Sequence, residues 1–88
     1  MKSEITRGFR KRYSLLPPEI QAQARQAYSL WLRDPWHNSL RFKRVHRVYP
    51  VYSARVGSDW RVLGTLDDNV VLWFWIGAHA EYDGILRQ

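Results

Sequence analysis

The sequence predicts an α+β fold in which an N-terminal helical hairpin packs on a small antiparallel sheet. Two observations lead to this fold class. Apolar residues recur at helical spacing in the first part of the chain, and from Leu40 onward short runs rich in Val, Leu, Phe, Tyr and Trp are separated by turn residues. Because domains typically contain roughly 100–150 residues, the 88 residues are expected to form a single domain, 1–88.

Two helices are expected first. Within residues 1–13, apolar residues at i, i+4 and i+8 indicate a short amphipathic helix, with a strand-like start as an option. The pair Pro17-Pro18 predicts a break and a new start, since proline is tolerated in the first helical turn. The strongest amphipathic pattern runs from Ile20 to Trp31, and Asp34-Pro35 ends it because the residue before proline avoids the α region.

About four strands follow. Turn signals divide the remaining chain into runs at residues 40–48, 51–56, 60–66 and 70–76. The last run is apolar at both parities, which predicts an interior position in the sheet. Residues 79–86 are expected to form a short C-terminal helix or arm.

The charge distribution indicates an anionic partner. The net charge is +6, and eleven of the fourteen basic residues are Arg, whose planar fork suits phosphate. Residues 1–65 hold thirteen basic and four acidic groups (+9), whereas residues 66–88 hold one and four (−3). Nucleic acid or an acidic protein would fit this surface. The alternative is a solvated basic surface that binds nothing anionic.

Several classes of function are excluded or disfavoured. Without cysteine there are no disulfides or thiolate metal sites, and the longest apolar run is far shorter than the roughly 20 residues of a membrane span. The N-terminus has no apolar signal-peptide region, so a cytoplasmic location is expected. No His/Asp/Glu set has ligand-like spacing and no Gly-rich phosphate loop occurs, so neither metal nor cofactor is expected.

The alternation of side chains along β-strands predicts a pair of facing arginines. If Gly57-Ser58-Asp59 is a three-residue hairpin loop, the flanking strands share one consistent apolar face, and Arg55 lies directly opposite Arg61 on the other face. Like charges facing across a ladder destabilise by up to roughly 1 kcal/mol. Such a cost is tolerated most readily where an anion sits between the two groups.

Two tryptophans are expected to join this face. A three-residue loop at 67–69 would set Trp75 beside Arg61 and Trp73 beside Leu63, giving the phosphate clamps and stacking platforms that suit single-stranded nucleic acid. The alternative is that these indoles pack under a loop or partner. The first strand adds a basic stripe that should follow a nucleic-acid backbone: Arg41, Lys43, Arg44, His46 and Arg47.

His79 is the main candidate for proton transfer. RNA cleavage needs a base for the 2′-hydroxyl, an acid for the leaving oxygen and cations for the phosphate, and His titrates near neutrality. His79 follows the last strand, with Glu81 and Tyr82 close by. The alternative is that His79 caps the last helix and bonds Tyr82 or Asp83. His37, just after the second helix, is expected to be a loop or cap residue.

Three segments together resemble the RelE/ParE superfamily of type II toxin–antitoxin toxins: LLPPEIQAQARQAYSLWLRDPWHNSLRFKRV, YSARVGSDWRVLG and WFWIGAHAEYDGIL. The resemblance implies a RelE-like fold with a helical hairpin on a curved antiparallel sheet. It also implies one of two activities, which are ribosome-dependent cleavage of mRNA without a metal and poisoning of DNA gyrase. In either case a cognate antitoxin is the implied partner.

Residue by residue, the resemblance implies that Arg61 contacts the scissile phosphate and that Lys43 and Arg55 contact phosphate or ribosomal RNA. His79 resembles the C-terminal general base of the YafQ/HigB-like branch, and Tyr82 is expected to stack or to orient that base. The leading hypothesis is therefore an mRNA endonuclease toxin acting on the ribosome. A gyrase poison and a non-catalytic module that binds nucleic acid or an acidic amphipathic antitoxin segment stay open as alternatives.

Overall fold

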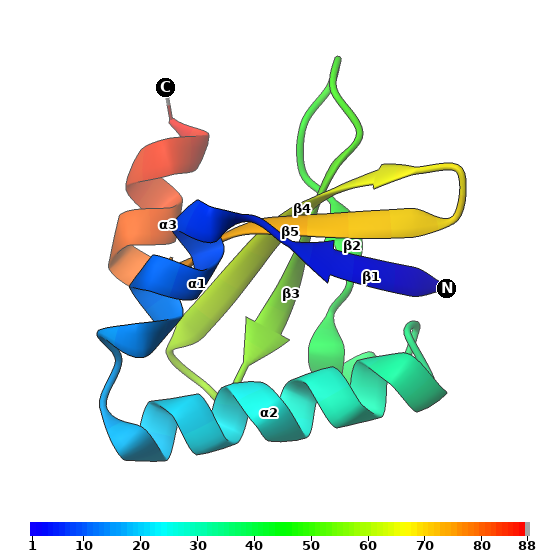
Figure 1. Ribbon diagram of the computed structural model, residues 1–88. Coiled ribbons are helices and arrows are strands. Elements are labelled where there is room, and N and C mark those ends of the chain that lie inside the picture. Colours follow the sequence, from blue (N-terminus) through cyan, green and yellow to red (C-terminus); the bar gives the residue numbers. More distant parts are fainter. Residues whose placement is uncertain (88) are drawn as a thin grey trace.

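Five strands form one sheet in the order β1-β5-β4-β3-β2, and three α-helices pack on it (Figure 1). The computed structural model describes residues 1–87. The elements in chain order are β1 (Lys2–Ile5), α1 (Arg7–Ser14), α2 (Pro18–Arg33), the 3₁₀ turn η1 (Asn38–Leu40), β2 (Lys43–Arg44), β3 (Val51–Val56), β4 (Trp60–Asp67), β5 (Val70–Ala78) and α3 (His79–Leu86). The predicted α+β class, helical hairpin and C-terminal helix are confirmed.

The sheet is mixed, which corrects the expectation of a purely antiparallel sheet of about four strands. β1 is a fifth strand and pairs in parallel with β5, with Lys2 opposite Val70. It ends where the Thr6 hydroxyl accepts a hydrogen bond from the Phe9 amide and so caps α1. β5 therefore lies between β1 and β4, and its predicted interior position is confirmed.

The predicted first strand at residues 40–48 is largely wrong, because only Lys43 and Arg44 pair with β3. Leu40 ends η1, and Arg41 follows it in the left-handed region with φ 47°. Beyond β2, the His46 side chain accepts hydrogen bonds from backbone amides of its own loop. Such local hydrogen bonds compete with a β-ladder, which is why the pairing ends at Arg44 and the basic residues His46 and Arg47 lie outside the sheet.

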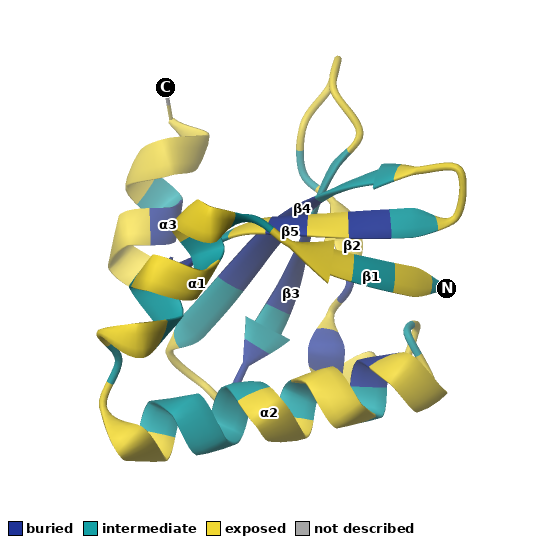
Figure 2. Ribbon diagram, in the orientation of Figure 1, coloured by how far each residue is buried: buried dark blue, intermediate teal, exposed yellow. Residues whose placement is uncertain are grey.

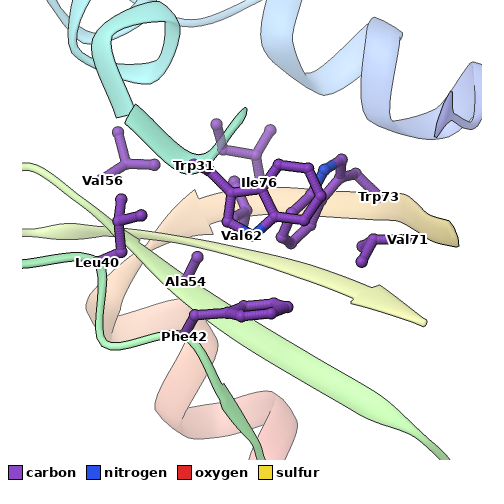
Figure 3. Packing of buried hydrophobic residues seen from close by; sticks show 9 residues of the cluster. All are labelled: Trp31, Leu40, Phe42, Ala54, Val56, Val62, Val71, Trp73 and Ile76. Carbon is purple, nitrogen blue, oxygen red and sulfur yellow. The ribbon is translucent and has the colours of Figure 1, made fainter. Parts of the chain in front are cut away.

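The core lies between α2 and one face of the sheet. Trp31 of α2 packs edge-on against Trp73 of β5 and against Phe42, with ring centroids 5.4 Å and 5.8 Å apart (Figure 3). Figure 2 shows buried residues on the neighbouring strands β3, β4 and β5. The α2-facing cluster comprises Trp31, Leu40, Phe42, Ala54, Val56, Val62, Val71, Trp73 and Ile76.

The β4–β5 hairpin differs from the three-residue loop that was expected. Asp67 pairs with Val70, so the loop contains two residues, and both Asp68 and Asn69 have positive φ, as a type I′ turn requires. The register then shifts between Leu63 and Gly64. A bulge of this kind places an extra residue on one strand and bends it.

Gly64 is needed at this bulge because side chains of the neighbouring strand β5 lie close to its Cα. A Cβ at this position would lie 2.7 Å from side-chain carbons of both Trp73 and Val71. We expect Gly64→Ala to lower the free energy of unfolding by about 1–3 kcal/mol, the usual cost of overpacking. Urea denaturation measures this value. Gly84→Ala is the matched control, since nothing lies within 4 Å of its Cβ and alanine favours the helix, and a loss of stability there equal to that at Gly64 would contradict the explanation.

Within residues 1–87, no helix combines the length and apolar character required to cross a membrane.

Candidate functional site

The predicted register of the β3–β4 hairpin is confirmed. Val56 lies opposite Trp60, Ala54 opposite Val62, and Arg55 opposite Arg61. Ala54 and Val62 belong to the α2-facing core. Because side chains alternate along a strand, the two arginines project from the other face of the sheet.

These arginines border a cleft of about 470 Å³ on the face of the sheet opposite α2. Side chains from β2, β3, β4 and α3 converge there although they are far apart in the sequence. The basic residues outnumber the single carboxylate, so the cleft is suited to an anion. Its lining consists of Arg41, Lys43, Ser53, Arg55, Arg61, His79, Tyr82, Asp83 and Leu86.

The two facing arginines are held by backbone carbonyls of their own hairpin. Arg55 donates from Nε to the Gly57 carbonyl at 2.9 Å, and Arg61 donates from Nη1 to the Trp60 carbonyl at 2.8 Å. Burial, followed by the positive charge of Arg55, lowers the pKa of Arg61 below its usual value. Partial burial beside a like charge makes the positive charge of Arg61 costly in free energy, and a bound anion would offset this cost.

His79 is the first residue of α3 and lies at the rim of this cleft. Its amide donates to the Asp59 carbonyl at 2.7 Å, which fixes the start of α3 against the β3–β4 loop. Its side chain is 46% exposed, and Nε2 lies 3.2 Å from Oδ2 of Asp83 one turn later. If Nε2 donates to this carboxylate, the lone pair of a neutral imidazole lies on Nδ1. The carboxylate thus orients an imidazole that can accept a proton.

Tyr82 connects α3 to the sheet and lies next to His79. The residue is 7% exposed, and its hydroxyl donates to Oγ of Ser53 on β3 at 3.2 Å. Its ring lies edge-on to the imidazole of His79, with centroids 6.0 Å apart. This placement suits the role of orienting His79, one of the two roles expected for Tyr82, whereas its burial leaves no open ring face for stacking on a base.

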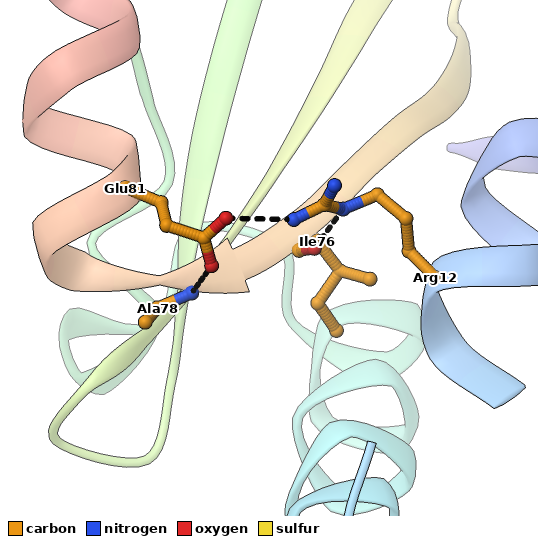
Figure 4. Close-up of polar contacts among 4 residues, drawn as sticks. All are labelled: Arg12, Ile76, Ala78 and Glu81. Carbon is orange, nitrogen blue, oxygen red and sulfur yellow. Dashed lines mark hydrogen bonds and ion pairs between the residues drawn. The ribbon is translucent and has the colours of Figure 1, made fainter. Parts of the chain in front are cut away.

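A second connection to α3 comes from Arg12 of α1, which the sequence analysis did not single out (Figure 4). Arg12 donates from Nε to the Ile76 carbonyl at 2.7 Å and from Nη2 to Glu81 at 3.1 Å. Glu81 also accepts from the Ala78 amide at the start of α3. Arg12 lies 64 positions from Ile76 and 69 positions from Glu81 in the sequence. No sequence pattern connects residues so far apart, so only the fold reveals these contacts.

The two predicted stacking tryptophans do not line the cleft, which corrects that expectation. Because of the bulge, Trp73 lies opposite Gly64 and Trp75 opposite Leu63, while Arg61 lies opposite Gly77. Trp73 is 4% exposed and belongs to the α2-facing core. Trp75 is half-buried, with the guanidinium of Arg12 5.1 Å from its ring centroid.

The predicted basic stripe divides into two groups. Arg41 and Lys43 line the cleft. Arg44 instead donates to the carbonyls of His46 and Val48, and His46 accepts from amides of its loop, so these two side chains build the loop. Arg47 is exposed in the same loop. His37 caps η1 by accepting from the Ser39 amide, which confirms its expected cap role.

A second concavity, of about 380 Å³, lies on the α2 side, between β1, α1 and α2. Apolar side chains such as Phe9, Tyr28 and Trp31 dominate its walls, and no histidine lines it. It therefore has no counterpart to the imidazole of the cleft, although arginines, among them Arg10 and Arg25, also line it. Among residues 1–87, no group of three or more His, Asp or Glu side chains is arranged to hold a metal ion.

Comparison with solved structures shows the same fold in known toxins. The crystal structure of YafQ from E. coli strain BL21(DE3) matches with a TM-score of 0.73 at 16% identity, covering 92% of this chain and 96% of that one. The toxin–antitoxin complex RelBE2 from Mycobacterium tuberculosis matches with a TM-score of 0.70 at 25% identity, covering 88% and 95%. The RelB–RelE complex from Methanococcus jannaschii gives a TM-score of 0.72 at 13% identity, covering 92% and 95%.

No curated protein matches this chain in sequence. The family model of the ParE-like toxin domain matches residues 18–84, from the start of α2 into α3, and so includes both facing arginines and His79. The chain therefore belongs to the ParE-like toxin family, within the RelE/ParE superfamily.

Proposed function

We propose that this protein is a toxin of a toxin–antitoxin system that cleaves mRNA on the ribosome and thereby inhibits translation. The observation that carries the proposal is that the facing Arg55 and Arg61 share one cleft with the exposed imidazole of His79. RNA cleavage by internal attack needs cations for the phosphate and a base for the 2′-hydroxyl, and the cleft supplies candidates for both.

In the proposed reaction the scissile phosphate lies between Arg55 and Arg61. His79 accepts the proton of the adjacent 2′-hydroxyl, whose oxygen attacks phosphorus. The bond from phosphorus to the 5′-oxygen breaks, leaving a 2′,3′-cyclic phosphate, and the 5′-oxygen takes up a proton from water as it leaves. Charge grows on the phosphate oxygens during attack, and fixed guanidiniums stabilise it without reorganising. Asp83 stabilises the imidazolium that forms, and Lys43 and Arg41 extend the contact along the RNA backbone.

Primer extension on translating ribosomes tests this activity. Purified protein is added to a defined initiation or elongation complex, and new 5′ ends are mapped on the mRNA. We expect cuts within the codon that occupies the A site. Intact mRNA at protein concentrations that arrest growth would contradict the proposal.

The family model that matches is named for ParE, and this favours a gyrase poison as the second candidate function. A poison needs no proton-transfer group, so the presence of His79 in the cleft weighs against it. A supercoiling assay with cleavage complexes scored separates the two functions. Stalled gyrase complexes in the absence of mRNA cleavage would support the second candidate.

We also propose an antitoxin with an acidic amphipathic segment as the partner that covers the arginine face. Several structural neighbours are complexes of a toxin with its antitoxin. The cleft and the net charge of +6 complement an acidic segment. If the protein is instead only a binding module for nucleic acid or antitoxin, its expression will not arrest growth and its binding will depend steeply on salt.

A further inference from the structure

The loop between β2 and β3, residues 45–50, is here named the aromatic loop. It projects from the sheet (Figure 1), and most of it is exposed (Figure 2). Two adjacent large hydrophobic residues of the loop are exposed to solvent. Val48 is 70% and Tyr49 63% exposed. Neither the core nor the cleft uses these side chains.

Hydrogen bonds hold the aromatic loop in one conformation. The Nδ1 atom of His46 accepts from the amides of Val48 and Tyr49, both at 3.0 Å. Arg44 donates to the carbonyls of His46 and Val48 at 3.1 Å and 3.2 Å. The imidazole also lies against the ring of Tyr49, with centroids 5.0 Å apart. A preorganised aromatic side chain loses little conformational entropy when it binds.

The surroundings of the loop favour an anionic partner over an apolar one. The chain has no acidic residue between Asp34 and Asp59, while Arg47 is exposed in the loop. An exposed aromatic ring beside a guanidinium is the combination that binds single-stranded nucleic acid, in which bases stack and phosphates pair with cations.

The loop also continues from the cleft. β2 and β3, which it joins, contribute Lys43, Ser53 and Arg55 to the cleft lining. Strands rise about 3.3 Å per residue, so Val51, which directly follows the loop, lies roughly 13 Å along β3 from Arg55. A strand of RNA held by its phosphate at the arginines can reach this loop within a few nucleotides.

We infer that the aromatic loop is a second contact for single-stranded RNA, in which Tyr49 stacks on a base outside the cleft and Arg47 pairs with a neighbouring phosphate. This inference rests on the proposed function, since it concerns the same RNA that the cleft would hold. It assigns Arg44 and His46 to positioning Tyr49 and not to direct phosphate contact.

Binding of labelled single-stranded RNA, followed by fluorescence anisotropy, tests the inference. All variants carry His79→Gln so that the RNA stays intact. We expect Tyr49→Ala to weaken binding about 5- to 150-fold, the effect of losing one stacked base. Tyr49→Phe keeps the ring and should bind within about twofold of the parent. Leu15→Ala removes a side chain that is 77% exposed elsewhere, and serves as the matched control without effect.

The second part of the test compares the binding of short and long RNA. A dinucleotide held by its single phosphate at the arginines is expected to end short of the loop. Tyr49→Ala should therefore not change the affinity for the dinucleotide, whereas the affinity for longer RNA should fall. Unchanged binding of long RNA by Tyr49→Ala would overturn the inference. It would also be overturned if this variant bound an antitoxin more weakly but bound RNA as tightly as the parent. Cleavage by the parent protein is scored separately, so a protein that binds RNA through Tyr49 but cuts none would contradict the proposed function alone.

Discussion

Replacement of His79 by glutamine is expected to lower the rate of mRNA cleavage about 10²- to 10⁴-fold, the usual contribution of a positioned general acid or base. Glutamine retains a polar side chain but cannot exchange a proton near neutral pH. Single-turnover cleavage on programmed ribosomes measures the rate constant directly. Because the His79 side chain is 46% exposed, the free energy of unfolding should change by no more than about 0.5 kcal/mol.

The control for this substitution is a second histidine outside the cleft. His37 caps η1 by accepting from the Ser39 amide, and asparagine can make the same bond. His37→Asn should therefore cleave at the rate of the parent protein. If His79→Gln also cleaves at that rate while folded, His79 transfers no proton and its contact with Asp83 only stabilises α3.

Truncation of Arg61 should reduce cleavage about 10²- to 10³-fold, as expected when a fixed donor to the transition-state charge is lost. Arg61→Lys should restore only part of the rate, because lysine keeps the charge without the planar fork. The same single-turnover assay applies. Arg33→Ala, on the exposed surface of α2, is the matched control and should leave cleavage unchanged.

The stability of the arginine variants provides an independent readout of the pair. Truncating either Arg55 or Arg61 relieves the same repulsion across the β3–β4 ladder. The double variant should therefore be less stable than the two single changes predict by addition, by up to about 1 kcal/mol. Additive changes in the free energy of unfolding would show that the two guanidiniums do not repel one another and that no anion is needed between them.

Local rules predicted the β3–β4 hairpin because both determinants lie within a few residues. Gly57 supplies the positive φ of the loop, and alternation of apolar residues along the two strands fixes which face is buried. The facing pair Arg55 and Arg61 follows from this register. The same rules predicted the wrong loop length and register for the β4–β5 hairpin, because its bulge depends on how Trp73 fits over Gly64 and against α2.

The bulge explains why the predicted indoles were misplaced. In a regular strand, residues two apart share a face, so Trp73 and Trp75 were expected on one side. The extra residue sends them to opposite sides, one into the core and the other under Arg12. Packing of large rings against a helix decides this, and the sequence of β5 alone carries no sign of it.

By itself, the amino-acid sequence determined the fold class, the α2 pattern, the facing arginines and the candidate His79, because each depends on periodicity or on neighbours along the chain. The tertiary structure decided that β1 joins the sheet, that residues 45–50 leave it, and that Arg12 and Tyr82 fix α3 beside the cleft. These features depend on contacts between distant segments, whose energies exist only once the chain has folded.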